Sequence, residues 1–179
     1  GSYLPDRILS NEEISKTVAT SDEWVKKNLG IETRRIAAPE ETTSDLAYNA
    51  SIKALEDANI SATDLDAIIV ATSSPDRISP STACILQDKL GAYGICAFDV
   101  NAVCSGFIYG LTLANSMLTQ PHFKKILLVG AETYSRITDW SDRQCVYFGD
   151  GAGAVIVEKR DLGFFDFDLG ADGKGKEYF

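Results

Sequence analysis

The residues best suited to chemistry lie in segment 98–107, where an apolar run leads into Cys104 and then directly into a helical pattern. Residues 97–103 are mostly apolar, which is typical of a strand, and Ser105 and Gly106 are small enough to let a substrate approach the thiol. Beyond them, apolar residues recur at spacings of three and four. They predict a helix with a wide apolar face made of Phe107, Ile108, Leu111, Leu113, Ala114, Met117 and Leu118.

Cys104 is therefore expected where a strand passes into a helix. The first turn of a helix has unpaired N–H groups and a partial positive charge, which together favour a thiolate over a thiol. Cys104 is a candidate nucleophile on this ground. The local pattern also fits an inert core thiol, because free cysteine is among the most buried residue types.

Capping signals predict the helices that surround this segment. Residues 20–23 form a Thr-x-x-Glu capping box, with Thr20 as the N-cap of a short helix that ends at Gly30. Thr42 or Thr43 caps a second helix that ends near Asn59. The core face of that helix is expected to contain Leu46, Ala47, Ala50, Ala54, Leu55 and Ala58.

A third capping signal lies farther along the chain. Ser79 and Pro80 fit the N-cap and first position of a helix that ends before Gly91. The helix after Cys104 is expected to end near Gln120.

Strand patterns alternate with these helices. Residues 65–72 and 125–130 form continuous apolar runs, as in strands covered on both faces, and segments 152–157 and 164–169 supply two more strands. This alternation predicts an α/β layered fold in which a mixed sheet is covered by helices and residues 1–179 share one core.

A glycine-rich segment, 149–153, resembles a phosphate-binding loop but lacks the following Lys-Ser/Thr and leads into a strand. We expect a structural role: a tight turn at 149–151 and close packing behind the helix of Cys104.

Composition excludes several classes of function. The 179 residues carry a net charge of −9, which argues against a general nucleic-acid surface, and no apolar run is long enough for a membrane span. No signal peptide is evident, so a cytoplasmic location is expected.

The metal-ligating residue types are sparse. Cys84, Cys96, Cys104 and Cys145 show no C-x-x-C spacing, so free thiols and no metal site are expected. The single histidine, His122, lies about 20 Å from Cys104 across the intervening helix, and we interpret it as a solvated loop residue.

Five segments in order, together with 98–107, resemble the beta-ketoacyl-acyl carrier protein synthase III family. They are residues 1–5, 20–24 with 30–31, 36–39, 142–143 and 148–154. The resemblance implies the N-terminal half of a thiolase-like fold, with a short opening strand before Gly1 and the whole C-terminal half absent.

The resemblance implies that Cys104 is acylated by an acyl-coenzyme A primer, which is a substrate and not a cofactor. Malonyl-acyl carrier protein then condenses with the acyl group and loses carbon dioxide, which initiates fatty acid biosynthesis. The family takes the assisting histidine and asparagine from its second half.

The same resemblance places three residues at the coenzyme A site. Trp24 and Arg143 match positions that sandwich the adenine, and Thr20 matches a position at the tunnel mouth. From the residues alone, Trp24 could instead be a core aromatic. Asn28 stands where many members have an arginine, which puts one contact to the phosphates or carrier protein in doubt.

Residues 72–81 match the segment that crosses the homodimer interface and closes the partner's acyl pocket. Ser79 stands where members restricted to acetyl primers have a bulky aromatic, so a longer acyl channel is expected. Two alternatives stay open: a related synthase or acyltransferase of secondary metabolism, of the quinolone or polyketide type, and a non-catalytic partner subunit.

Overall fold

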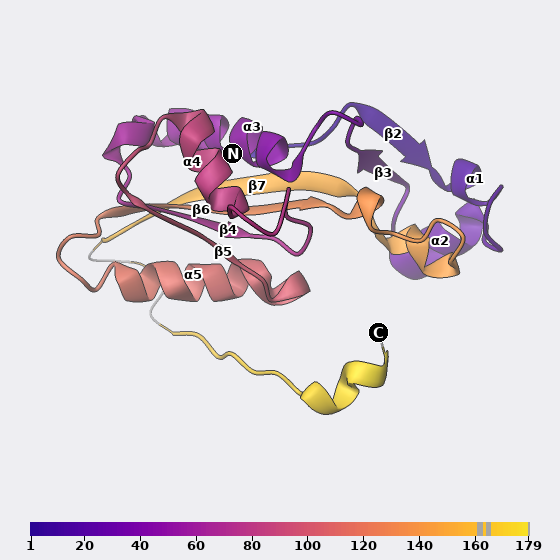
Figure 1. Ribbon diagram of the computed structural model, residues 1–179. Helices are drawn as coiled ribbons and strands as arrows, with labels where there is room; N and C mark the ends of the chain where they lie inside the picture. Colours follow the sequence, from indigo (N-terminus) through magenta and orange to yellow (C-terminus); the bar gives the residue numbers. More distant parts are fainter. Residues whose placement is uncertain (161–162, 164–165, 179) are drawn as a thin grey trace.

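A five-stranded mixed sheet forms the centre of the computed structural model, which describes residues 1–160, 163 and 166–178 (Figure 1). The strand order is β1-β7-β6-β4-β5, in which β4, β5 and β6 are parallel and β7 is antiparallel to both β6 and β1. A separate hairpin pairs β2 with β3. The strands are β1 (Ser2–Tyr3), β2 (Arg7–Ser10), β3 (Thr33–Ile36), β4 (Ala67–Ala71), β5 (Cys96–Val100), β6 (Lys125–Thr133) and β7 (Asp150–Glu158).

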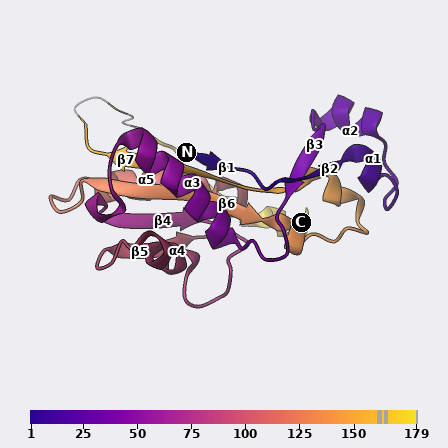
Figure 2. The same cartoon turned by 90° about the horizontal axis from the view of Figure 1, so that it is seen from above.

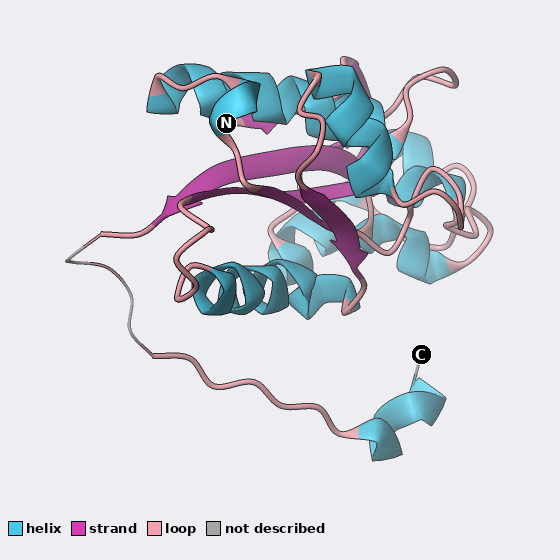
Figure 3. Cartoon of the chain, turned by 60° about the vertical axis from the view of Figure 1, so that its left-hand side comes forward, coloured by secondary structure: helices cyan, strands magenta, loops and turns pink. Residues whose placement is uncertain are grey.

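Helices cover both faces of this sheet. Helices α3 and α4 lie on one face and α5 lies on the other (Figures 1 and 3). The helices are α1 (Asn11–Ile14), α2 (Asp22–Leu29), α3 (Thr43–Ala58), α4 (Thr82–Leu90) and α5 (Gly106–Met117), with short 3₁₀ helices η1 (Ala62–Asp64), η2 (Val103–Ser105), η3 (Tyr134–Arg136), η4 (Arg143–Tyr147) and η5 (Gly173–Tyr178).

Double coverage explains why the central strands are apolar throughout. Every residue of β4 is buried, because its two faces pack against different helices. One core cluster lies between the sheet and α3 with α4, and includes Leu46, Val70, Leu86 and Val129. A second cluster lies against α5 and includes Ile69, Ala114, Leu118 and Leu128. The expected α/β layered fold is confirmed.

Helix α3 begins and ends as its sequence predicts. The Thr42 side chain accepts from the Asp45 N–H, the Asp45 side chain accepts from the Thr42 N–H, and Asn59 ends the helix at φ 52°. Ala58 was expected in the core but is exposed, because it lies on the outer side of the last turn.

Two other helices begin one or two residues later than predicted. Ser21, and not Thr20, is the N-cap of α2, since its hydroxyl accepts from the Trp24 N–H; Gly30 ends the helix as expected. Ser81, and not Ser79, is the N-cap of α4, and the Ser79-Pro80 peptide bond is cis.

Helix α5 is less buried and shorter than its pattern suggested. It ends at Met117 instead of Gln120, and Ile108 and Leu113 remain exposed at 51% and 41%. The part of its apolar face that meets the sheet, mainly β4 and β6, is in the core.

The glycine-rich segment differs from its prediction in two respects. Asp150 and Gly151 belong to strand β7 and not to a turn before it. Gly149 packs against β3, where an added Cβ would lie 2.8 Å from the Arg34 Cβ, so the close contact is not behind α5. In the strand expected at 164–169, Phe164 and Phe165 lie outside the described residues, and 166–169 is not a strand.

The hairpin β2–β3 projects from one end of the sheet together with α1 and α2 (Figure 2). These elements and η4 share a third core cluster, which contains Leu9, Ile14, Val18, Val25, Ile36, Cys145 and Val146. Within the part of the chain that the structure describes, no helix is long and apolar enough to cross a bilayer.

Candidate active site

Cys104 lies in the short turn η2, directly between strand β5 and helix α5. The sequence predicted this placement, and it brings the thiol to the edge where the parallel strands β4, β5 and β6 end. Open α/β sheets bind ligands outside the carboxyl ends of their strands. The Cys104 side chain is exposed, so the interpretation as an inert core thiol does not hold.

The backbone beside Cys104 is strained. Val103 has φ 48°, in the left-handed region that β-branched residues rarely adopt. Such a conformation costs on the order of 1–3 kcal/mol, persists only where the surrounding structure enforces it, and is found mostly at functional sites. The strain is consistent with a turn that holds the Cys104 thiol toward solvent.

A cavity of about 260 Å³ opens beside the thiol. Its wall is mostly apolar or aromatic, with one carboxylate, and it is lined by Ala71, Val103, Cys104, Phe107, Gly130, Ala131, Glu132, Tyr134 and Phe148. The rings of Tyr134 and Phe148 stack with centroids 5.0 Å apart. The cavity therefore offers an apolar binding surface within reach of a nucleophile.

Glu132, at the end of β6, is saturated with hydrogen bonds from the segment after β4. Its two oxygens accept from the Ser73 N–H at 2.9 Å, the Ser74 N–H at 3.0 Å, the Ser73 hydroxyl at 2.9 Å, the Ser74 hydroxyl and the Thr72 hydroxyl at 3.4 Å. These contacts occupy both oxygens of the carboxylate. We interpret Glu132 as the residue that fixes the start of the 72–81 loop.

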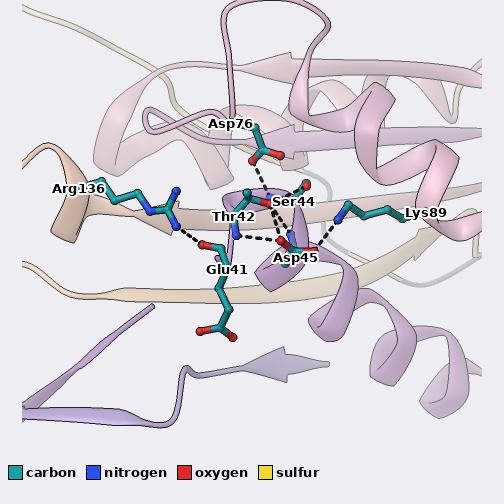
Figure 4. A network of polar contacts seen from close by, with 7 residues as sticks. All are labelled: Glu41, Thr42, Ser44, Asp45, Asp76, Lys89 and Arg136. Atoms are coloured by element: carbon teal, nitrogen blue, oxygen red, sulfur yellow. Dashed lines mark hydrogen bonds and ion pairs between the residues drawn. The ribbon is translucent and has the colours of Figure 1, made fainter. Parts of the chain in front are cut away.

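Two aspartates hold the rest of that loop. Asp76 accepts from the Ser44 N–H at 2.8 Å, at the first turn of α3 (Figure 4). Asp99, on β5, accepts from the first two N–H groups of α4 at 2.8 and 2.7 Å. The Asp99 carboxylate thus accepts from the two N–H groups that the Ser81 N-cap, which accepts from the Cys84 N–H, leaves unpaired, and together they begin α4 after Ser81 and not at Ser79.

The same view shows how the end of β6 is joined to α3 (Figure 4). Lys89 forms an ion pair with Asp45 at 2.5 Å, and Arg136 donates to the carbonyl of Glu41. These contacts tie helices α3 and α4 and the segment after β6 into one framework around the site.

Trp24 and Arg143, which the sequence analysis paired, lie together. The Arg143 Cζ is 4.4 Å from the centroid of the Trp24 ring, a cation–π contact between α2 and the start of η4. Trp24 is 36% exposed and belongs to no core cluster, so it is not a core aromatic. Because the two groups already touch, a planar base could enter between them only if they separate.

Two buried residues, Arg34 and Asn11, are hydrogen-bonded to the elements that carry this stack, and no sequence pattern had pointed to them. Burial lowers the pKa of the Arg34 guanidinium, with the neighbouring Cys145 acting in the opposite direction. Burial likewise raises the pKa of the Cys145 thiol, which keeps it protonated and unreactive.

The other predicted site residues are more dispersed. Thr20 is half-buried, and its hydroxyl has no hydrogen-bond partner in the part of the chain that the structure describes. Ser79 is exposed and does not line the cavity of its own chain. Asn28 donates to the Trp24 carbonyl at 2.8 Å, which caps the helix backbone. His122 is exposed beyond the opposite end of α5 from Cys104, as expected.

No group of three His, Cys, Asp or Glu residues with metal-binding geometry occurs among the described residues. The arrangement instead supports nucleophilic chemistry, with an exposed thiol on a strained turn before a helix.

Comparison with known proteins gives a consistent family. Residues 98–173 match the family model for 3-oxoacyl-(acyl-carrier-protein) synthase III. Beta-ketoacyl-(acyl-carrier-protein) synthase III of Xanthomonas campestris is 53% identical over 99% of this chain and 55% of its own length. The enzyme of Xylella fastidiosa is 54% identical with the same coverage. The chain thus spans about half the length of the curated relatives it matches.

Solved structures agree with these matches. The synthase III of Thermus thermophilus has a TM-score of 0.92 and 42% identity, over 99% of this chain and 56% of that one. The Aquifex aeolicus enzyme has a TM-score of 0.87 and 48% identity, over 90% and 53%. The priming ketosynthase of the R1128 polyketide pathway reaches 0.86 at 34% identity, over 90% and 49%.

Proposed function

Because the chain belongs to the beta-ketoacyl-(acyl-carrier-protein) synthase III family, we propose that it is the acyl-accepting part of a decarboxylating condensing enzyme. Its substrates are an acyl-coenzyme A primer and malonyl-acyl carrier protein, and its reaction initiates fatty acid synthesis in the cytoplasm. The observation that carries the proposal is the exposed thiol of Cys104 beside an apolar cavity.

The proposed reaction begins with transfer of the acyl group. The Cys104 sulfur attacks the thioester carbonyl, a new carbon–sulfur bond forms, and coenzyme A leaves as the thiol. Loss of carbon dioxide from the malonyl group then supplies an enolate, which forms the carbon–carbon bond and releases Cys104. By resemblance, the histidine and asparagine of this second step come from the family's second half.

Trp24 and Arg143 are the proposed adenine site, with Thr20 beside it. A purine can stack on both an indole and a guanidinium plane, and both groups are at the surface. Their contact at 4.4 Å requires them to open when the base binds. Among the described residues the Thr20 hydroxyl, just before α2, is buried and has no hydrogen-bond partner, so it could contact the coenzyme only when the surrounding groups move.

The 72–81 loop supports the proposed homodimer. Ile78 is fully exposed at 101%, so its apolar side chain is free to contact a second subunit. We propose that Ser79 reaches the acyl pocket of the partner subunit, where its small side chain leaves room for primers longer than acetyl.

Steady-state condensation with malonyl-acyl carrier protein tests this function. The full-length gene product should consume octanoyl-coenzyme A faster than acetyl-coenzyme A and release carbon dioxide, and Cys104→Ala should abolish both. Ser79→Phe should restore the preference for acetyl. Equal or better turnover with acetyl-coenzyme A in the unsubstituted protein would refute the open-pocket proposal.

A second candidate follows from the R1128 priming ketosynthase, which is similar in structure. In that case the thiol would be acylated as proposed, but a carrier protein of secondary metabolism would supply the malonyl group. Comparing fatty acid and polyketide carrier proteins in the same assay distinguishes the two.

A further inference from the structure

Arg34 is a buried cation that forms no ion pair with any carboxylate of the described residues. It is 7% exposed. Its Nη1 donates to Asn11 Oδ1 at 2.7 Å and its Nη2 donates to the Val146 carbonyl at 2.7 Å. An unpaired charge is expensive to bury, so a residue held this way needs an explanation beyond packing.

Asn11 extends this network to helix α2. It is fully buried, and besides accepting from Arg34 it donates from Nδ2 to Asp22 Oδ1 and to the Ile31 carbonyl, both at 2.9 Å. Asp22 is the first residue of α2, and Ile31 follows the glycine that ends it. A single amide therefore fixes both ends of the helix that carries Trp24.

The other branch of Arg34 reaches the segment that carries Arg143. Val146 lies in η4, which begins at Arg143 and ends next to Phe148 in the wall of the Cys104 cavity. The Arg34 guanidinium is thus the common hydrogen-bond partner of α2, through Asn11, and of η4, through a main-chain carbonyl.

The two ends of this network carry the two halves of the surface stack. Trp24 comes from α2 and Arg143 from η4, and their separation of 4.4 Å depends on how these elements sit relative to each other. Apolar contacts alone do not set that spacing sharply, whereas planar hydrogen-bonding groups at 2.7 Å do.

We propose that Arg34 and Asn11 are positioning residues for the nucleotide of the acyl-coenzyme A substrate: they hold α2 and η4 so that Trp24 and Arg143 form one stacking site. The inference rests on the proposed function for the identity of that nucleotide. It adds that affinity for the coenzyme part of the substrate is controlled from the protein interior, by residues that do not touch it.

The test compares two thioesters of the same acyl group in the full-length protein. Acyl-coenzyme A has the nucleotide, and the N-acetylcysteamine thioester lacks it. Arg34→Met should raise KM for acyl-coenzyme A about tenfold, as expected when one base loses its stacking site, and leave kcat within about twofold. Acylation by the N-acetylcysteamine thioester should not change.

The matched control is Arg35→Met. Arg35 is the next residue of β3 and donates to the Pro5 and Asp6 carbonyls, away from α2 and η4, so neither thioester should be affected. Arg34→Lys keeps the charge but cannot donate to two partners in the fork geometry of a guanidinium. It should therefore raise KM for acyl-coenzyme A by a smaller factor than Arg34→Met, again without changing acylation by the N-acetylcysteamine thioester. If Arg34→Met does not fold, Arg34→Lys provides the same comparison of the two thioesters.

A double variant separates positioning from general damage. If Arg34 acts through the stack, Trp24→Ala with Arg34→Met should be no worse toward acyl-coenzyme A than Trp24→Ala alone. Additive losses, or equal losses for the two thioesters, would overturn the positioning role. If Trp24→Ala itself does not distinguish the thioesters, it is the proposed adenine site that fails.

A measurement without substrate tests whether Arg34 affects the contact between Trp24 and Arg143, whether or not that contact is the adenine site. In a full-length background in which every tryptophan except Trp24 is replaced by phenylalanine, Trp140 included, the fluorescence emission of Trp24 should change in Arg34→Met as it does in Arg143→Met. Emission that shifts in Arg143→Met but not in Arg34→Met would contradict the inference.

Discussion

Replacing Glu132 by glutamine should destabilise the protein, although the two side chains have nearly the same shape. Each Glu132 oxygen accepts from a different main-chain N–H, of Ser73 at 2.9 Å and of Ser74 at 3.0 Å. Glutamine has one carbonyl oxygen and one NH₂ group. In either amide orientation, the NH₂ group therefore faces an N–H that cannot rotate away.

The magnitude follows from those two contacts. A buried donor left without an acceptor costs about 1–3 kcal/mol, and hydrogen bonds to a charged group are stronger than those to a neutral one. The serine and threonine hydroxyls can rotate toward another acceptor, so their lost contacts add little to the cost of the substitution. Glu132→Gln should therefore lower the free energy of unfolding by about 2 kcal/mol.

Urea unfolding of the purified protein measures this quantity. Glu40→Gln is the control, because it makes the same chemical change at an exposed position and should stay within about 0.5 kcal/mol of the unsubstituted protein. If Glu132→Gln is as stable as Glu40→Gln, the loop after β4 is not held by the carboxylate and our account of Glu132 is wrong.

Three further outcomes are expected. Gly149→Ala should destabilise by about 1–3 kcal/mol in thermal unfolding, because its Cβ would lie 2.8 Å from the Cβ of Arg34. Asp99→Asn should cost a similar amount, since an NH₂ group would face one of the two N–H groups that Asp99 now accepts from; unchanged stability would contradict this. The hydrogen bond to Glu41 raises the pKa of Tyr3 from 10.0 to about 12. The contribution of this hydrogen bond to the free energy of unfolding is thus complete below pH 10 and lost as pH rises through 12. Tyr3→Phe should remove one late step from the tyrosinate absorbance titration.

Strong local patterns predicted most of the layered fold. The run at 65–72 corresponds to β4, and the cap at Thr42 with the stop at Asn59 gives α3. In these elements the local signal and the tertiary contacts agree, because burial on both faces or on one helix face directly produces the pattern.

Predictions failed where a distant side chain determined the local structure. The start of α4 is held by Asp99, which is 16 or 17 residues away from the two N–H groups that donate to it, as well as by the Ser81 N-cap. A local capping rule does not register Asp99, and it favoured Ser79 because Pro80 suits the first position of a helix. The exposure of Ile108 was missed for another reason. Its side chain is as apolar as those of Phe107 and Leu111, which pack against the sheet, so the pattern could not separate them.

The candidate site was predictable only in part. Cys104 could be predicted because the strand pattern before it and the helix pattern after it lie in contiguous residues. The network of Arg34 joins it to Asn11 and Val146, which are 23 and 112 residues away, and no periodicity links them. An acidic residue at the end of a buried strand, as at Glu132, is a signal that could have been used.

The most direct test of the account is the intact mass of the full-length protein after incubation with octanoyl-coenzyme A, followed by peptide mapping. We predict one octanoyl group per chain, attached to Cys104, and none in Cys104→Ala. Cys96 is the internal control, because it is also exposed but lies on β5 outside the cavity. Absence of an adduct, or acylation of Cys96 to the same extent as Cys104, would contradict the assignment of Cys104 as the acyl-accepting nucleophile.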